Sequence, residues 1–94
     1  MRESWFPMNK IFSDIAWGHY QYWIITDKKV LKKINELIHD IERNGNDGIG
    51  KPEPLKNELS GYWSRRITDT HRLIYSIDEH NIYIAKCKGH YDDK

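Results

Sequence analysis

Three short strand-like runs, separated by very short links, fill the second half of the chain and leave few folds open. They cover about 61–68, 71–77 and 81–88 and are rich in aromatic and β-branched residues. Runs of this composition, bounded by turn residues, are typical of β-strands. The links, "DT" around 69–70 and "DEHN" at 78–81, are so short that neighbouring strands must reverse direction. The sequence therefore predicts a meander of antiparallel strands.

Two helices are predicted before this meander. The first covers about 13–25, with Ser13 as its N-cap, and its apolar residues recur at helical spacing: Ala16, Tyr20, Trp23 and Ile24. The second follows the N-cap Asp27, ends at "RNGND", and has a clearer apolar line: Val30, Leu31, Ile34, Leu37, Ile38 and Ile41. A short strand, "MNKIFS", begins at Met8. This order predicts an α+β fold with the helices on one face of the sheet.

Composition narrows the class of protein. The chain has 94 residues, enough for one small domain whose core can draw on four Trp, six Tyr and two Phe. The formal net charge is +1, so the molecule as a whole is not a strongly basic nucleic-acid binder. A single cysteine excludes an internal disulfide. There is no apolar run of the roughly 20 residues that a membrane helix needs, and no signal-peptide pattern, so we expect a cytoplasmic protein.

The segment "KPEPLK" is the first candidate for chemistry. Each proline fixes its own φ and disfavours a helical conformation for the residue before it, so Glu53 lies in a stiff, extended segment between Lys51 and Lys56. Such a segment can be a rigid surface loop with solvated charges. It can also present a carboxylate at a fixed place, as a general base requires.

Arginines of the strand region form the second candidate. Side chains alternate along a strand, so Arg65 shares a face with Trp63 and Ile67, and Arg66 points to the other face. Arg72 lies among apolar residues and should have an anionic partner, because an unpaired buried charge is costly. That partner is either a carboxylate of the protein or a phosphate, which suits the planar guanidinium.

The end of the last strand supplies the third candidate. The strand breaks at Gly89, and His90 and Tyr91 follow. Alone, they can be an unimportant chain end. With Glu53 and Arg72, however, they complete a set suited to RNA cleavage, which needs a base for the 2′-OH, a cation for the phosphorane and an acid for the leaving oxygen. Histidine can be acid or base near neutral pH.

Other sites are less well supported. Cys87 in a strand is typical of a small core residue, and the histidines show no metal-ligand spacing, so no metal site is expected. On the second helix Lys28, Lys29, Lys32 and Lys33 lie near its start. They form either a solvated surface or a contact face for a nucleic acid or partner.

The motifs "KKINELI", "GIGKPEPLK", "LSGYWSRRIT", "HRLIY" and the terminal "HY", in this order, resemble the YoeB toxins, the Txe/YoeB branch of the RelE superfamily. The resemblance covers roughly residues 8–91. It implies two N-terminal helices on a twisted, mainly antiparallel sheet, the RelE-like microbial ribonuclease-type fold. It also implies cleavage of mRNA in the ribosomal A site, without a metal or other cofactor, and neutralisation by a YefM-type antitoxin.

Position by position, the resemblance implies roles for four residues. Glu53 is the general base, Arg72 stabilises the transition state, His90 is the general acid, and Tyr91 orients the substrate or the acid. The residues expected to bind RNA or the ribosome are basic: Lys28, Lys29, Lys32, Lys33, Lys51, Lys56, Arg65 and Arg66. The expected products are a 2′,3′-cyclic phosphate and a 5′-hydroxyl. A homodimer, and operator DNA bound through the antitoxin complex, are further expectations.

The resemblance also sets the expected domain limits. Residues 1–7 are interpreted as an N-terminal extension, 8–91 as the toxin domain and 92–94 as a C-terminal extension. Two carboxylates, Asp92 and Asp93, would repel RNA, although salt screens exposed charges over about 8–10 Å. Besides the ribosome-dependent nuclease, two functions stay open. One is a relative that has lost activity and serves as an antitoxin-bound co-repressor, and the other is a nuclease that cleaves free RNA.

Overall fold

A computed structural model of the chain describes residues 7–90. The elements follow the predicted order, with two helices before the meander: β1 (Asn9–Phe12), α1 (Asp14–Thr26), α2 (Lys28–Asn44), β2 (Glu53–Pro54), a 3-10 turn η1 (Asn57–Leu59), β3 (Trp63–Arg66), β4 (Arg72–Ile77) and β5 (Asn81–Lys86). The predicted α+β fold is confirmed.

Both helices begin at the predicted caps. The Ser13 side chain accepts a hydrogen bond from the Ala16 amide, and Asp27 accepts from the amides of Lys29 and Val30. Such side-chain acceptors satisfy amide groups that have no partner inside the helix. At the other end of α2, Gly45 has φ 64°, a conformation that glycine adopts without steric cost.

The five strands form one sheet in the order β1-β5-β4-β3-β2. The pairs β3–β4 and β4–β5 are antiparallel, as the short links predicted. The edge strand β1 pairs with β5 in parallel, which makes the sheet mixed but mostly antiparallel. At the other edge, β2 pairs with β3. The strand β2 lies inside the segment that the sequence indicated as a stiff connection.

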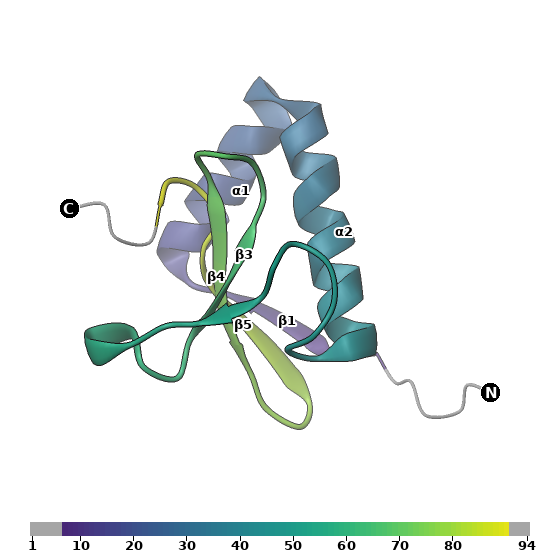
Figure 1. Cartoon of the computed structure of the whole chain (residues 1–94). Coiled ribbons are helices and arrows are strands. Elements are labelled where there is room, and N and C mark those ends of the chain that lie inside the picture. Colours follow the sequence, from purple (N-terminus) through teal and green to yellow (C-terminus); the bar gives the residue numbers. More distant parts are fainter. Residues whose placement is uncertain (1–6, 91–94) are drawn as a thin grey trace.

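The core lies between the helices and one face of the sheet, with both helices on the same side of the strands (Figure 1). Its residues come from both helices, from β4 and β5 and from the segment after β5, and include Ala16, Trp23, Ile34, Leu37, Ile41, Leu73, Tyr75, Ile82, Ile84 and Cys87. The predicted apolar line of α2 is buried at Val30, Ile34, Leu37, Ile38 and Ile41, while Leu31 is partly buried. Ile24, one of the apolar residues that recur at helical spacing in α1, is 38% exposed. Neither α1 nor α2 covers the opposite face of the sheet, which we call the helix-free face and which carries the site described next.

Candidate active site

The pairing register places Glu53 on the helix-free face of the sheet. Glu53 of β2 pairs with Ser64, Ser64 with Ile74, and Ile74 with Lys86. Paired residues of antiparallel strands point to the same face, so these four side chains form one row across the sheet. Leu73 and Tyr75, which flank Ile74 in β4, lie in the core on the other face. Glu53 is exposed.

The neighbouring row contains two arginines. Arg66 of β3 pairs with Arg72 of β4, two residues along from Ser64 and Ile74. Strand spacing puts the Arg72 backbone about 10 Å across the sheet from Glu53, and about 7 Å along it. The register therefore places Glu53 and Arg72 on the same face of the sheet, two strands apart.

The Arg72 backbone also fixes the chain just before His90. Its amide donates to the carbonyl of Gly89 at 2.9 Å. His90, which is partly buried, therefore follows a residue paired with the start of β4. Tyr91 lies outside the described residues, so its role stays a prediction.

The Arg72 side chain is 7% exposed. Its Nη1 donates to the carbonyls of Thr68, Asp69 and His71, at 2.7, 3.2 and 3.2 Å. Within residues 7–90 no carboxylate forms an ion pair with it. The sequence left open whether a protein carboxylate or a phosphate is the anionic partner of Arg72. In the described residues, the hydrogen-bond acceptors of its guanidinium are neutral backbone carbonyls. These contacts orient the guanidinium at the turn between β3 and β4.

Side chains from α1 and β4 hold the segment that leads to His90. Trp23 Nε1 donates to the Cys87 carbonyl at 2.9 Å, and His19 Nδ1 accepts from the Cys87 amide at 3.2 Å. His71 Nδ1 accepts from the Gly89 amide at 2.8 Å, and the His71 ring meets Trp23 edge-on. Residues 87–89 are thus held from two sides. Sequence reasoning did not find these positioning contacts, because the residues are far apart in the chain.

Two titratable groups of this region have shifted pKa values. Burial lowers the pKa of His19, and the positive charges of Lys88 and Lys86 and the nearby His71 lower it further. The neutral ring can then accept the Cys87 amide. Burial raises the pKa of the Cys87 thiol to about 12. Cys87 is thus the buried core residue that the sequence indicated.

Backbone hydrogen bonds hold the segment that carries Glu53. The Arg66 amide donates to the Gly50 carbonyl at 2.7 Å, and the Leu55 amide donates to the Tyr62 carbonyl at 2.9 Å. Lys51, just before Pro52, has φ 52°, a left-handed conformation that is uncommon for a residue with a side chain. Glu53 is therefore anchored on both sides of β2.

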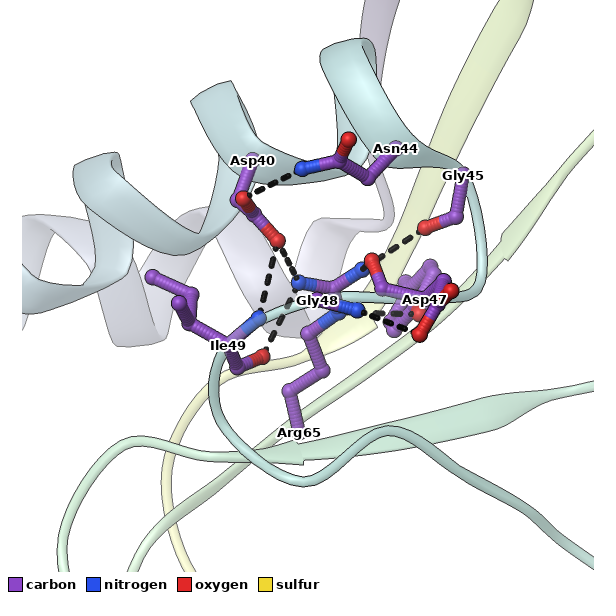
Figure 2. Close-up of polar contacts among 8 residues, drawn as sticks. Asp40, Asn44, Gly45, Asp47, Gly48, Ile49 and Arg65 are labelled. Atoms are coloured by element: carbon purple, nitrogen blue, oxygen red, sulfur yellow. Dashed lines mark hydrogen bonds and ion pairs between the residues drawn. The ribbon is translucent and has the colours of Figure 1, made fainter.

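The expectation that Arg65 binds RNA phosphate is wrong. Its side chain is fully buried on the core side of β3, as strand alternation requires. Figure 2 shows its guanidinium inside the loop that follows α2, bound to the carboxylate of Asp40. It also donates to the carbonyls of Gly45, Asp47 and Ile49 and to the Tyr75 hydroxyl. Its donors are used inside the protein, and Arg65 fastens loop 45–50, just before the Glu53 segment, to β3.

The partner of Arg65 has a shifted pKa as well. Burial would raise the pKa of Asp40, but hydrogen bonds from Arg65, the Ile49 amide and Asn44 outweigh burial and lower it. Asp40 is therefore ionised at neutral pH and balances the buried arginine.

The predicted lysines separate into two groups. Lys51 and Lys56 are exposed and flank β2 in the chain, next to Glu53. Lys28, Lys29 and Lys32 are exposed and Lys33 is partly buried, all on α2 in the helix layer. The structure does not bring these four into the rows that hold Glu53 and Arg72.

Residues 7–90 contain no cluster of His, Cys, Asp and Glu side chains that could hold a metal ion. In the same part of the chain, no helix is long and apolar enough to cross a membrane.

Comparison with known proteins gives consistent matches. The family model described as "YoeB-like toxin of bacterial type II toxin-antitoxin system" matches residues 12–91. Toxin YoeB of Escherichia coli (strain K12) is 54% identical over 84 residues, which are 89% of this chain and 100% of the relative. Toxin YoeB of Streptomyces coelicolor is 50% identical over 84 residues, again 89% of this chain and 100% of the relative.

Solved structures agree with these matches. The YoeB dimer of Staphylococcus aureus superposes with a TM-score of 0.87 at 53% identity, over 92% of this chain and 100% of that one. The toxin in the heterotetrameric YoeB–YefM complex of the same species gives 0.85 at 53% identity, with the same coverage. A Mycobacterium tuberculosis toxin–antitoxin complex, RelBE2, shows the same fold at 24% identity and a TM-score of 0.66. The chain therefore belongs to the YoeB family of toxins from bacterial type II toxin–antitoxin systems.

Proposed function

We propose that the chain is a ribosome-dependent endoribonuclease that cleaves mRNA in the A site. The observation that supports this most is the register of β2, β3 and β4, in which Glu53 and Arg72 lie on the same face of the sheet and the Arg72 amide bonds to the segment leading to His90. An exposed carboxylate, an oriented guanidinium and an imidazole are the groups that 2′-OH attack on a phosphodiester requires.

In this mechanism Glu53 takes the proton from the ribose 2′-OH, whose oxygen attacks the adjacent phosphorus. Arg72, with the exposed Arg66 paired beside it, stabilises the additional negative charge of the phosphorane. His90 gives a proton to the leaving 5′-oxygen, and Tyr91 orients the substrate or the acid. The products are a 2′,3′-cyclic phosphate and a 5′-hydroxyl, and no metal takes part.

The ribosome is proposed as co-substrate because the protein carries little net charge. With a formal net charge of +1, bulk electrostatic attraction contributes little to holding an RNA strand. Positioning of the message on the ribosome supplies the orientation that the reaction needs. The exposed Lys51 and Lys56, near Glu53, and the lysines of α2 are proposed as contacts to RNA or ribosome.

The partners follow from the relatives. The YoeB–YefM complex and the YoeB dimer, each formed by a protein 53% identical to this chain, support a YefM-type antitoxin and a homodimer as partners here. We propose that operator DNA is bound through the antitoxin complex. The matched relatives span most of the chain, which supports the toxin domain limits of 8–91.

The test is cleavage of a message during translation. Purified protein is added to a cell-free translation reaction, and the 5′ ends of the fragments are mapped by primer extension. Wild type should cut within A-site codons, whereas Glu53→Gln and His90→Gln should cut at least 100-fold more slowly, as expected for loss of a general base or acid. Glu58→Gln, an exposed glutamate of η1 in the same connection, is the matched control and should cut like wild type.

Two results would contradict the proposal. If wild type leaves translated messages intact and matches Glu53→Gln, the chain serves as an antitoxin-bound co-repressor, which YefM-type antitoxin and operator binding would then show. If naked RNA is cut as fast as translated RNA, the protein is an ordinary nuclease and the ribosome is not a co-substrate.

A further inference from the structure

A recess of about 210 Å³ opens on the face of the sheet opposite α1 and α2, and two of its lining residues, Ile74 and Lys86, belong to the row that contains Glu53. Its lining comes from the connection after β2 and from the two central strands: Leu59, Tyr62, Ile74, Ala85 and Lys86. The proposed mechanism uses none of these residues.

The recess is built into the fold by two features. First, the connection from Leu55 to Tyr62 turns back on itself, closed by the hydrogen bond between these two residues, and covers Ile74, which is 2% exposed although it points away from the core. Second, the pairing of β4 with β5 is irregular: Ile74 pairs with Lys86 and Tyr75 with Ile84. Ala85 is therefore left without a partner in β4, and its small side chain leaves the space open.

The register also relates the recess to the proposed reaction centre. Trp63 pairs with Tyr75, so extending this pairing by one residue places Tyr62 beside Ser76. These two residues form the row next to that of Ser64 and Ile74. Arg66 and Arg72 lie one row from Ser64 and Ile74 in the opposite direction. Two residues along a strand span about 7 Å. Ile74 of the recess therefore lies about 7 Å along β4 from Arg72, whereas the row of Tyr62 and Ser76 lies about 14 Å from the two arginines. The shorter distance is comparable with that between the phosphate of a nucleotide and its base.

We propose that this recess binds a nucleobase of the RNA strand, that of a nucleotide adjoining the phosphate held by Arg72. The proposal rests on the proposed cleavage and names a subsite for it. The ring of Tyr62 and the side chain of Leu59, both partly exposed, offer the surface on which a base stacks, and the 2% exposed Ile74 completes the apolar lining. Lys86 at its edge supplies a positive charge for the RNA backbone.

The size of the recess supports a single base as its occupant. Pockets for drug-sized ligands measure roughly 300–1,000 Å³, so 210 Å³ is too small for a folded peptide segment and suits one ring system. The charges around it favour a polyanion, since Lys86 and the two arginines of the next row lie on the same face.

The test uses binding, so that it does not depend on cleavage. The full chain, with labelled methyl groups, is titrated with a 2′-O-methylated RNA trinucleotide, which cannot undergo 2′-OH attack, and separately with ribose 5-phosphate. The trinucleotide should shift the NMR signals of the Ile74 and Ala85 methyl groups, and ribose 5-phosphate should not. Equal shifts from both probes, or no shift from the trinucleotide at millimolar concentration, would overturn the proposal.

Variants locate the binding. Tyr62→Ala should weaken trinucleotide binding about 5- to 150-fold, the range for loss of one stacking contact. Tyr22→Ala, a 45% exposed tyrosine of α1 in the helix layer, is the matched control and should bind like wild type. Ala85→Leu fills the recess and should abolish the shift of the Ile74 methyl signals while far-ultraviolet circular dichroism stays unchanged. Unaltered affinity in Tyr62→Ala would contradict the proposal.

Cleavage assays separate this inference from the proposed function. If Tyr62→Ala cuts translated messages with the same base preference at the cleavage site as wild type, the proposed nuclease activity is supported and the proposed base-binding recess is contradicted. If the trinucleotide binds in the recess and nothing is cut, the recess stands and the nuclease is wrong. Protection of the recess by a YefM-type antitoxin, with no binding of RNA, would assign it to the antitoxin instead.

Discussion

At the residue scale, strand alternation decides what each arginine does. Arg65 and Arg66 are neighbours in the chain, yet one is fully buried and the other is exposed. Alternation correctly predicted that they point to opposite faces. It did not show that the core-facing arginine would meet Asp40 and three carbonyls of the loop after α2. An arginine in a family motif can thus be structural while its neighbour in the chain faces solvent.

Arg65→Met should destabilise the protein by about 3–5 kcal/mol, because it leaves a carboxylate and several carbonyls without their donor. The measurement is the midpoint and slope of urea unfolding followed by circular dichroism. Arg66→Met, one residue further and exposed, is the control and should change the unfolding free energy by no more than about 0.5 kcal/mol. Similar values for the two variants would show that the buried contacts do not stabilise the fold.

At the scale of elements, α2 illustrates how local signals and packing combine. Its apolar line faces the core, and its first turn is capped by Asp27, which also ends α1 through its amide. One residue therefore sets the boundary between two helices. The short connection keeps the helices side by side, so they can cover one face of the sheet together.

Replacing Asp27 by Ala should cost about 1 kcal/mol, the usual effect of losing an N-cap acceptor. Here the amides of Lys29 and Val30 lose their side-chain partner. Urea unfolding measures the loss, and Asp27→Asn, which keeps an acceptor oxygen, should recover most of it. A variant as stable as wild type would mean that water replaces the cap at no cost.

The segment after β5 depends on a second element, α1, through His19 and Trp23. Because the folded-state pKa of His19 is lowered, folding favours its neutral form. The contribution to stability is present above the unfolded pKa of about 6.5 and is lost as pH falls from there towards the folded pKa. Protonation of Nδ1 would also remove the acceptor for the Cys87 amide.

We therefore expect amide hydrogen exchange at Cys87, corrected for the intrinsic effect of pH, to become less protected as pH falls below about 6.5. The His19→Asn variant, whose side-chain oxygen does not titrate in this range, should show a smaller change. His71 also contacts this segment through Gly89, so the informative quantity is the difference between the two proteins. Identical pH profiles would rule out His19 as the titrating contact.

At the scale of the whole molecule, two carboxylates of α2 connect the strands β3 and β1 to the helix layer. Asp40 binds Arg65 of β3, and Glu42 binds Lys10 of β1 and the amide of Met8. For both, burial would raise the pKa, but the hydrogen bonds and positive charges around them lower it overall. Each is more acidic folded than unfolded, so both stabilise the fold in their ionised form.

The lowered pKa values of Asp40 and Glu42 predict that the protein unfolds in acid. The stabilisation by both carboxylates is fully present above their unfolded pKa values, about 3.9 for Asp and 4.3 for Glu, and is lost as pH falls through the lower folded values. The urea midpoint should therefore fall steeply below about pH 4. A double variant, Asp40→Asn with Glu42→Gln, should be less stable at neutral pH and show a shallower fall. An equally steep fall in this variant would place the acid sensitivity elsewhere.

The sequence by itself determined the elements, because caps, periodicity and short links act between residues close in the chain. It predicted the α+β fold, both helix starts, the antiparallel meander and the burial of Cys87, and the order of its motifs indicated the family. The tertiary structure decided which side chains share a surface. It buried Arg65, tied residues 87–89 to His19, Trp23 and His71, and paired Glu53 with Ser64, contacts between residues up to 68 positions apart that no local pattern encodes.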